Sequence, residues 1–84
     1  MFRLIATDTF AKEMRKLENT VQKRIEEKLL LSAENPRLYF EGLTGAPLFK
    51  LRVGAYRIIA KISFPEKQIA LLSVKHRKNA YAKP

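Results

Sequence analysis

The sequence Phe-Lys-Leu-Arg-Val at residues 49–53 alternates between apolar and basic side chains. Because successive side chains of a β-strand point to opposite faces, this period of two predicts a strand with one apolar face and one basic face. Lys50 and Arg52 are expected to lie together on the basic face.

A second alternating segment follows after two residues. In Tyr-Arg-Ile-Ile-Ala-Lys-Ile, residues 56–62, one parity is apolar and the other carries Arg57 and Lys61. Gly54 suits the first central position of a type II′ turn, where φ is positive, so Gly54-Ala55 predicts a tight return of the chain. The two segments therefore predict an antiparallel hairpin with a single basic face.

The first half of the chain predicts one strand and two helices. Residues 3–7 are expected to form a short strand, and Thr7 or Asp8 to cap the helix that follows. Asn19 is the expected cap of a second helix, and Asn35-Pro36 its end, because the residue before proline is driven out of the α region. Apolar residues recur at helical spacing in both helices, as Phe10, Met14 and Leu17, then Val21, Ile25 and Leu29, with Leu30 and Leu31 widening the second stripe.

A third strand of the sheet is predicted at residues 68–74, after a turn in residues 64–67 that has proline at its second position. Residues 36–47 are expected to be a connection whose aromatic side chains pack on the sheet edge or contact a partner. The order β-α-α-β-β-β predicts a single α+β domain over residues 1–84, in which two helices cover one face of a mainly antiparallel sheet. The basic side chains are expected on the other face of the sheet.

Positive charge is concentrated in the second half of the chain. The net charge of +9 divides into +1 for residues 1–42, with 8 Lys/Arg and 7 Asp/Glu, and +8 for residues 43–84, with 9 Lys/Arg and one acidic residue. Such a field favours a polyanionic partner, such as nucleic acid, or an acidic protein surface. A basic surface that serves solubility alone is the alternative. No segment is apolar for long enough to be a secretory signal or a membrane span, and the absence of cysteine fits a reducing cytoplasm.

The residue types limit the chemistry of the predicted basic face. One histidine and no cysteine exclude an ordinary zinc site, no glycine-rich loop has the P-loop pattern, and the basic half has no carboxylate pair. Guanidinium groups can instead stabilise a phosphodiester, and lysine, histidine or tyrosine can transfer a proton. Taken alone, His76 would more often be a packed residue, and Tyr81 an anchor of the C-terminal tail. We expect one surface to be formed by Lys50, Arg52, Arg57, Lys61, Lys75, His76, Arg77, Lys78 and Tyr81.

Three motifs resemble those of the RelE/ParE toxin superfamily, in its RelE branch. They are Leu43-Thr44-Gly45, the segment from Phe49 to Arg57, and Val-Lys-His-Arg-Lys-Asn-Ala-Tyr at residues 74–81, and the resemblance extends over essentially the whole chain. It implies a microbial-RNase-like fold and an activity similar to that of RelE toxins of type II toxin–antitoxin systems. Those toxins cleave messenger RNA in the ribosomal A site without a metal or other cofactor, and leave a 2′,3′-cyclic phosphate and a 5′-hydroxyl. The implied partners are an acidic RelB-like antitoxin, in a heterodimer or heterotetramer, and the ribosome with its message.

By position, the resemblance assigns catalytic roles to Lys50, Arg52, Arg57, Arg77 and Tyr81, while Lys61, Lys75, His76 and Lys78 are expected to bind RNA. Arg52 departs from the family pattern, in which this position is often lysine, so the role of base moves to Lys50 or Tyr81. Two alternatives remain open. One is a ParE-like toxin that acts on DNA gyrase through protein contacts, although such toxins usually lack the tail tyrosine. The other is a non-catalytic relative that binds RNA or antitoxin.

Overall fold

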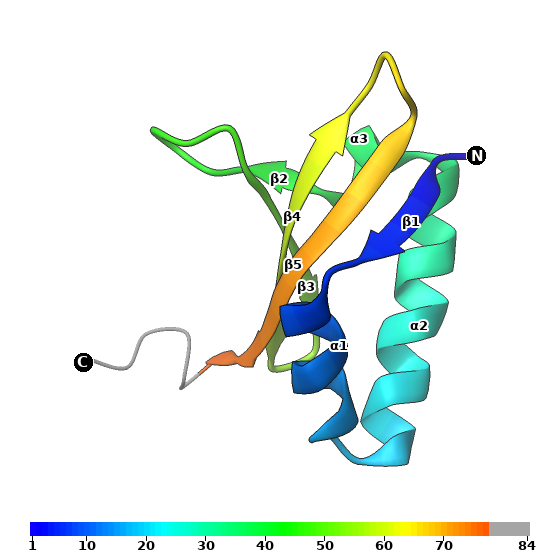
Figure 1. Cartoon of the computed structure of the whole chain (residues 1–84), viewed down its shortest axis with the longest axis vertical. Helices are drawn as coiled ribbons and strands as arrows, with labels where there is room; N and C mark the ends of the chain where they lie inside the picture. Colours follow the sequence, from blue (N-terminus) through cyan, green and yellow to red (C-terminus); the bar gives the residue numbers. More distant parts are fainter. Residues whose placement is uncertain (78–84) are drawn as a thin grey trace.

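The computed structural model describes residues 1–77 and has the predicted α+β architecture (Figure 1). Its strands are β1 (Arg3–Ala6), β2 (Glu41–Gly42), β3 (Phe49–Val53), β4 (Tyr56–Ser63) and β5 (Gln68–His76), and its helices are α1 (Asp8–Arg15), α2 (Asn19–Glu34) and α3 (Pro36–Tyr39). The strands form one sheet in the order β1-β5-β4-β3-β2. β1 is parallel to β5, and the other neighbours are antiparallel. No helix in residues 1–77 is long and apolar enough to cross a membrane.

Two short elements lie in the segment that was expected to be a plain connection. α3 is a single turn that begins at Pro36, whose fixed φ and missing N–H suit the first position of a helix. β2 has two residues and pairs with Phe49 and Lys50, the first two residues of β3. Within residues 1–77, the outer edge of β3 is therefore paired with another strand only at its start.

The hairpin of β3 and β4 forms as the alternation predicts. Val53 and Tyr56 are paired, which leaves Gly54-Ala55 as the two turn residues. Gly54 has a φ of +58°, the region that favours glycine. Leu51, Val53, Ile58 and Ala60 are buried on one face, so this face of the hairpin belongs to the core.

Helices α1 and α2 lie on the same side of the sheet (Figure 1). Phe10 and Met14 from α1, with Ile25 and Leu29 from α2, are buried against the apolar face of the sheet. Thr7 caps α1 as predicted, because its hydroxyl oxygen accepts the N–H of Phe10. The core is thus enclosed between one sheet face and two amphipathic helices.

Two expectations about α2 are wrong. Asn19 is the first helical residue, not the N-cap, and the residue before it, Glu18, makes no side-chain capping bond. Leu30 and Leu31 are 56% and 50% exposed. These two leucines widen the apolar stripe of α2 beyond the part of the helix that packs on the sheet, so they remain at the surface.

A register shift changes which face β5 presents. Ala60 pairs with Leu71, whereas Ile59 pairs with Ser73, so Leu72 is an extra residue without a partner on β4. Such an insertion reverses the inward and outward positions beyond it. The buried residues of β5 accordingly change from odd positions, Ile69 and Leu71, to an even one, Val74.

Helix α1 covers the edge of β5 beyond the end of β1. The hydroxyl of Thr7 donates to the carbonyl oxygen of Leu71 at 2.7 Å, and Oε1 of Glu13 accepts the backbone N–H of Val74 at 2.9 Å. Oε2 of the same carboxylate lies 2.5 Å from Nζ of Lys75. Side chains of α1 therefore take the place of a neighbouring strand along this half of β5.

Candidate functional site

Three cations lie in one row across the open face of the sheet. Arg52 on β3 is directly opposite Arg57 on β4, and Arg57 is directly opposite Lys75 on β5. Neighbouring strands are about 4.8 Å apart, so the row places the three basic residues side by side. Nζ of Lys75 is turned toward Glu13 of α1, so Arg52 and Arg57 supply the charge at the centre of the row. Like charges opposite one another destabilise a sheet. The arrangement is therefore unfavourable for the fold alone and well suited to an anionic ligand.

Lys50 extends this row, and Lys61 lies farther away. Lys50 precedes Arg52 by two residues on the same face of β3, where it is paired with Ile59. Lys61 is four residues beyond Arg57, or about 13 Å along the strand. The basic face, defined here as Lys50, Arg52, Arg57 and Lys75, thus has its centre near the β3–β4 turn.

Arg77 approaches the same end of the sheet. Its backbone N–H donates to the carbonyl oxygen of Ala55 in the turn at 2.5 Å, and its side chain is exposed. This bond ties the segment that follows β5 to the hairpin. The predicted catalytic residues Lys50, Arg52, Arg57 and Arg77 therefore come from three strands or their ends and gather around one turn.

Carboxylates flank the basic face on both sides. Glu41 of β2 lies 3.8 Å from Nζ of Lys50 and is 75% exposed, and Glu13 pairs with Lys75 at the opposite edge. Arg52, in the middle of β3, forms no ion pair with any residue among residues 1–77. The net charge at the centre of the face is consequently positive.

His76 does not lie on the basic face, contrary to the sequence-based expectation. It is paired with Tyr56, and its ring meets the ring of Tyr56 edge-on at a centroid distance of 5.1 Å. Because Tyr56 shares the parity of Ile58, both rings lie on the side of the sheet that carries the helices. The cause is the extra residue in β5. Lys78 and Tyr81, the remaining predicted site residues, lie outside the described part of the chain.

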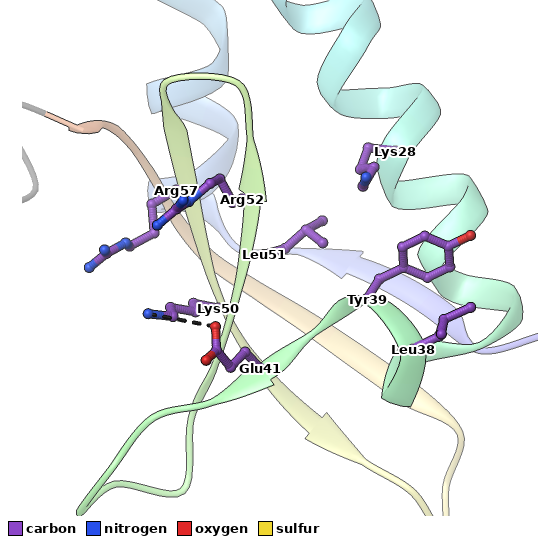
Figure 2. A pocket seen from close by; sticks show the side chains of 8 residues that line it. All are labelled: Lys28, Leu38, Tyr39, Glu41, Lys50, Leu51, Arg52 and Arg57. Atoms are coloured by element: carbon purple, nitrogen blue, oxygen red, sulfur yellow. Dashed lines mark ion pairs between the residues drawn. The ribbon is translucent and has the colours of Figure 1, made fainter.

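A pocket of about 270 Å³ opens beside the basic face, at the outer edge of β3 (Figure 2). Lys50, Arg52 and Arg57 project from the same side of the hairpin, whereas Leu51 points the other way. The rest of the lining is Lys28 from α2, Leu38 and Tyr39 from α3, and Glu41 from β2. Sequence analysis did not assign Lys28, Tyr39 or Glu41 to a site. Only the aromatic cluster at residues 38–40 signalled a possible contact.

Comparison with known proteins identifies the family. A sequence profile described as "ParE toxin of type II toxin-antitoxin system, parDE" matches residues 4–81. Among curated proteins, none matches the chain significantly.

Solved structures of toxins share the fold. A chain of the intact RelBE toxin–antitoxin complex of E. coli has 26% identity and a TM-score of 0.77, with 100% of both chains covered. A chain of the RelBE2 toxin–antitoxin complex from Mycobacterium tuberculosis has 23% identity and a TM-score of 0.85, with 90% of this chain and 98% of that one covered. The YoeB/ParE toxin from Agrobacterium tumefaciens has 13% identity and a TM-score of 0.75, with 89% and 98% covered. With the profile match over nearly its whole length, the chain belongs to the ParE toxin family of type II toxin–antitoxin systems, within the RelE/ParE superfamily.

Proposed function

We propose that this toxin is a metal-independent endoribonuclease that inhibits translation by cleaving messenger RNA, and that it acts in the cytoplasm on ribosome-bound message. The observation that carries the proposal is the row formed by Arg52, Arg57 and Lys75, with Lys50 beside it. Preorganised cations of this kind stabilise the negative charge that develops on phosphate oxygens in the transition state. The row lies on an open sheet face, where a strand of RNA can reach it.

The proposed reaction is attack by a ribose 2′-oxygen on the adjacent phosphorus. The 2′-hydroxyl gives its proton to a base, Lys50 or a water molecule, as its oxygen attacks phosphorus. The bond from phosphorus to the 5′-oxygen breaks, and that oxygen takes a proton from water. Arg52 and Arg57 stabilise the phosphorane charge, Lys50 assists the 2′-oxygen, and Arg77 assists the leaving 5′-oxygen. His76 is not available as a substitute for Arg77, because it lies on the other side of the sheet. Tyr81 is proposed to orient the base, and Lys61 and Lys78 to hold flanking phosphates.

An acidic antitoxin is the proposed protein partner. The +8 charge of residues 43–84 attracts an acidic segment, and charge complementarity of this kind speeds association and selects the partner. The related toxins of E. coli and M. tuberculosis were solved in complex with their antitoxins. Co-expression with the neighbouring gene should retain a small acidic protein through purification at moderate salt. Recovery of the toxin alone would contradict this part of the proposal.

A ParE-like action on DNA gyrase is the second candidate. The matching profile is named after ParE, which favours it. Mapping the 5′ ends of cellular messages after brief induction separates the two. New 5′-hydroxyl ends within reading frames support the ribonuclease, whereas intact messages with DNA damage support gyrase inhibition. Growth arrest with neither change would indicate the non-catalytic relative.

Substitution of the two exposed-face arginines tests the residue roles. Loss of one preorganised charge donor lowers a rate by about 10²–10³. The double variant Arg57→Ala/Arg77→Ala should therefore abolish message cleavage and growth arrest while remaining folded. Lys61→Ala, about 13 Å from Arg57 along β4 and proposed to hold a flanking phosphate, should lower the activity much less. Lys23→Ala, on the exposed side of α2 and outside the proposed site, is the control. A folded double variant that cleaves at the wild-type rate would disprove the assignment.

A further inference from the structure

The pocket at the outer edge of β3 has two different walls. One wall is formed by the basic face, through Lys50, Arg52 and Arg57. The other is formed by Tyr39 and Leu38 of α3, and Leu38 is 68% exposed. A cationic wall beside an aromatic and apolar wall matches the two parts of a nucleotide, since guanidinium groups bind phosphate and rings contact bases.

Tyr39 is held in place before any ligand arrives. Its side chain packs against the core, and Nζ of Lys28 lies 5.3 Å from the centre of its ring. A cation at this distance over an aromatic ring attracts it. The ring therefore loses little freedom when it contacts a base, which favours affinity.

The edge of β3 leaves a path between the two walls. β2 pairs only with Phe49 and Lys50, so within residues 1–77 no strand pairs with the outer edge of β3 from Leu51 onward, and side chains of α2 lie beside it. A single strand of RNA can cross this edge with a phosphate on the basic face and the neighbouring base on the other side. Leu51 lines the pocket between the two positions (Figure 2).

We propose that this pocket binds the base of a nucleotide adjacent to the phosphate held by Arg52 and Arg57, with Tyr39 as the residue that contacts the base. This inference depends on the proposed function in one respect, which is that the basic face must bind RNA. Glu41 lies at the same pocket and is 3.8 Å from Lys50. When a phosphate of the RNA pairs with Lys50 in place of Glu41, the carboxylate of Glu41 can accept a hydrogen bond from an amino group on the base edge. Tyr39 thus supplies affinity, and Glu41 supplies selectivity.

The test measures binding of a short 2′-O-methyl RNA, which lacks the free 2′-hydroxyl and is not cleaved. Matched oligonucleotides carry one abasic position, moved along the strand. Base–aromatic contacts contribute about 1–3 kcal/mol per base, so removal of the bound base should weaken wild-type binding by roughly 5- to 150-fold at one position. Tyr39→Leu, which keeps apolar packing, should bind the intact RNA more weakly by a similar factor and no longer respond to that abasic position. Tyr39→Phe keeps the ring and should behave as wild type, and thermal unfolding of both variants checks the fold.

A second variant tests selectivity. Glu41→Gln should alter the preference among bases at the same position while retaining the response to the abasic site, because the amide both donates and accepts hydrogen bonds.

The outcomes separate this proposal from the proposed function. If wild type binds RNA with a steep salt dependence and Tyr39→Leu binds equally well, the pocket assignment is overturned while the basic face stands. If Tyr39→Leu weakens only the capture of antitoxin, the pocket belongs to the protein partner and the proposal is also overturned. If wild type binds no RNA even at low salt, both proposals fail.

Discussion

Removal of the Glu13 carboxylate should destabilise this protein far more than an ordinary surface substitution. Glu13 accepts the N–H of Val74, a residue that is 3% exposed, and pairs with Lys75. In Glu13→Ala, the buried N–H of Val74 loses its acceptor and the edge of β5 opens beyond Leu71. The variant therefore removes a contact that substitutes for a neighbouring strand.

The magnitude follows from the two interactions. A hydrogen bond to a charged group contributes about 1.5–3 kcal/mol. The ion pair adds only about 0.2–1 kcal/mol, because half of the Lys75 side chain is exposed and water screens the charges. Glu13→Ala should thus lower the free energy of unfolding by about 3 kcal/mol, which corresponds to a fall in Tm of roughly 12–24 °C for a domain of this size. Glu13→Gln keeps an acceptor for Val74 and should lose about 1 kcal/mol.

Chemical and thermal denaturation measure these differences, and hydrogen exchange locates them. The amide of Val74 should exchange faster in Glu13→Ala than in the wild type, while the amide of Ile58 in the neighbouring strand should be much less affected. Glu27→Gln on the exposed side of α2 is the control and should change stability by no more than about 0.5 kcal/mol. An unfolding free energy for Glu13→Ala within that margin of the wild type would refute the role assigned to Glu13.

Two further measurements test the turn and the basic face. Gly54→Ala forces an L-residue to a φ of +58° and should lower the free energy of unfolding by about 1–3 kcal/mol in a denaturation experiment. Gly42→Ala is the control and should be tolerated, because its φ is ordinary and the added Cβ would lie 3.9 Å from Cε2 of Phe49. Equal effects of the two substitutions would contradict the turn assignment. RNA affinity should fall by about 50-fold between roughly 50 and 200 mM salt, from four phosphate contacts at a slope of about −0.7 each, and a flat titration would exclude the basic face as the binding surface.

The hairpin could be predicted from the sequence because its determinants are local. The alternation at residues 49–53 and 56–62 and the glycine at residue 54 specify strands, faces and turn without reference to the rest of the chain. This is why Lys50, Arg52 and Arg57 were placed together correctly. β2 has two residues and α3 is a single helical turn, so neither completes enough repeats to show its period, and both were missed.

The misplacement of His76 has a different cause. The expectation put the consecutive residues Lys75, His76 and Arg77 on one surface, but β5 extends to His76, so neighbouring side chains point to opposite faces. No residue type marks Leu72 as the insertion that decides which of them faces the helices. The bulge depends on how β5 matches β4, which is a tertiary property. In the sequence, Glu13 is likewise one of several charged residues on the solvent-facing side of a predicted helix. Its role as the acceptor for the N–H of Val74 depends on the packing of α1 against the edge of β5.

The position of β5 within the sheet has a consequence for the order of folding. β5 is the last strand within residues 1–77, yet it lies between β1 and β4, and its pairing with β1 joins residues as distant as Arg3 and Gln68. Contacts between distant residues form late and slow the folding of a domain. A growing chain that ends before residue 68 has an unpaired β1 and lacks Lys75 and Arg77. The complete basic face therefore assembles only after residues 68–77 have been synthesised, well after the β3–β4 hairpin has been translated.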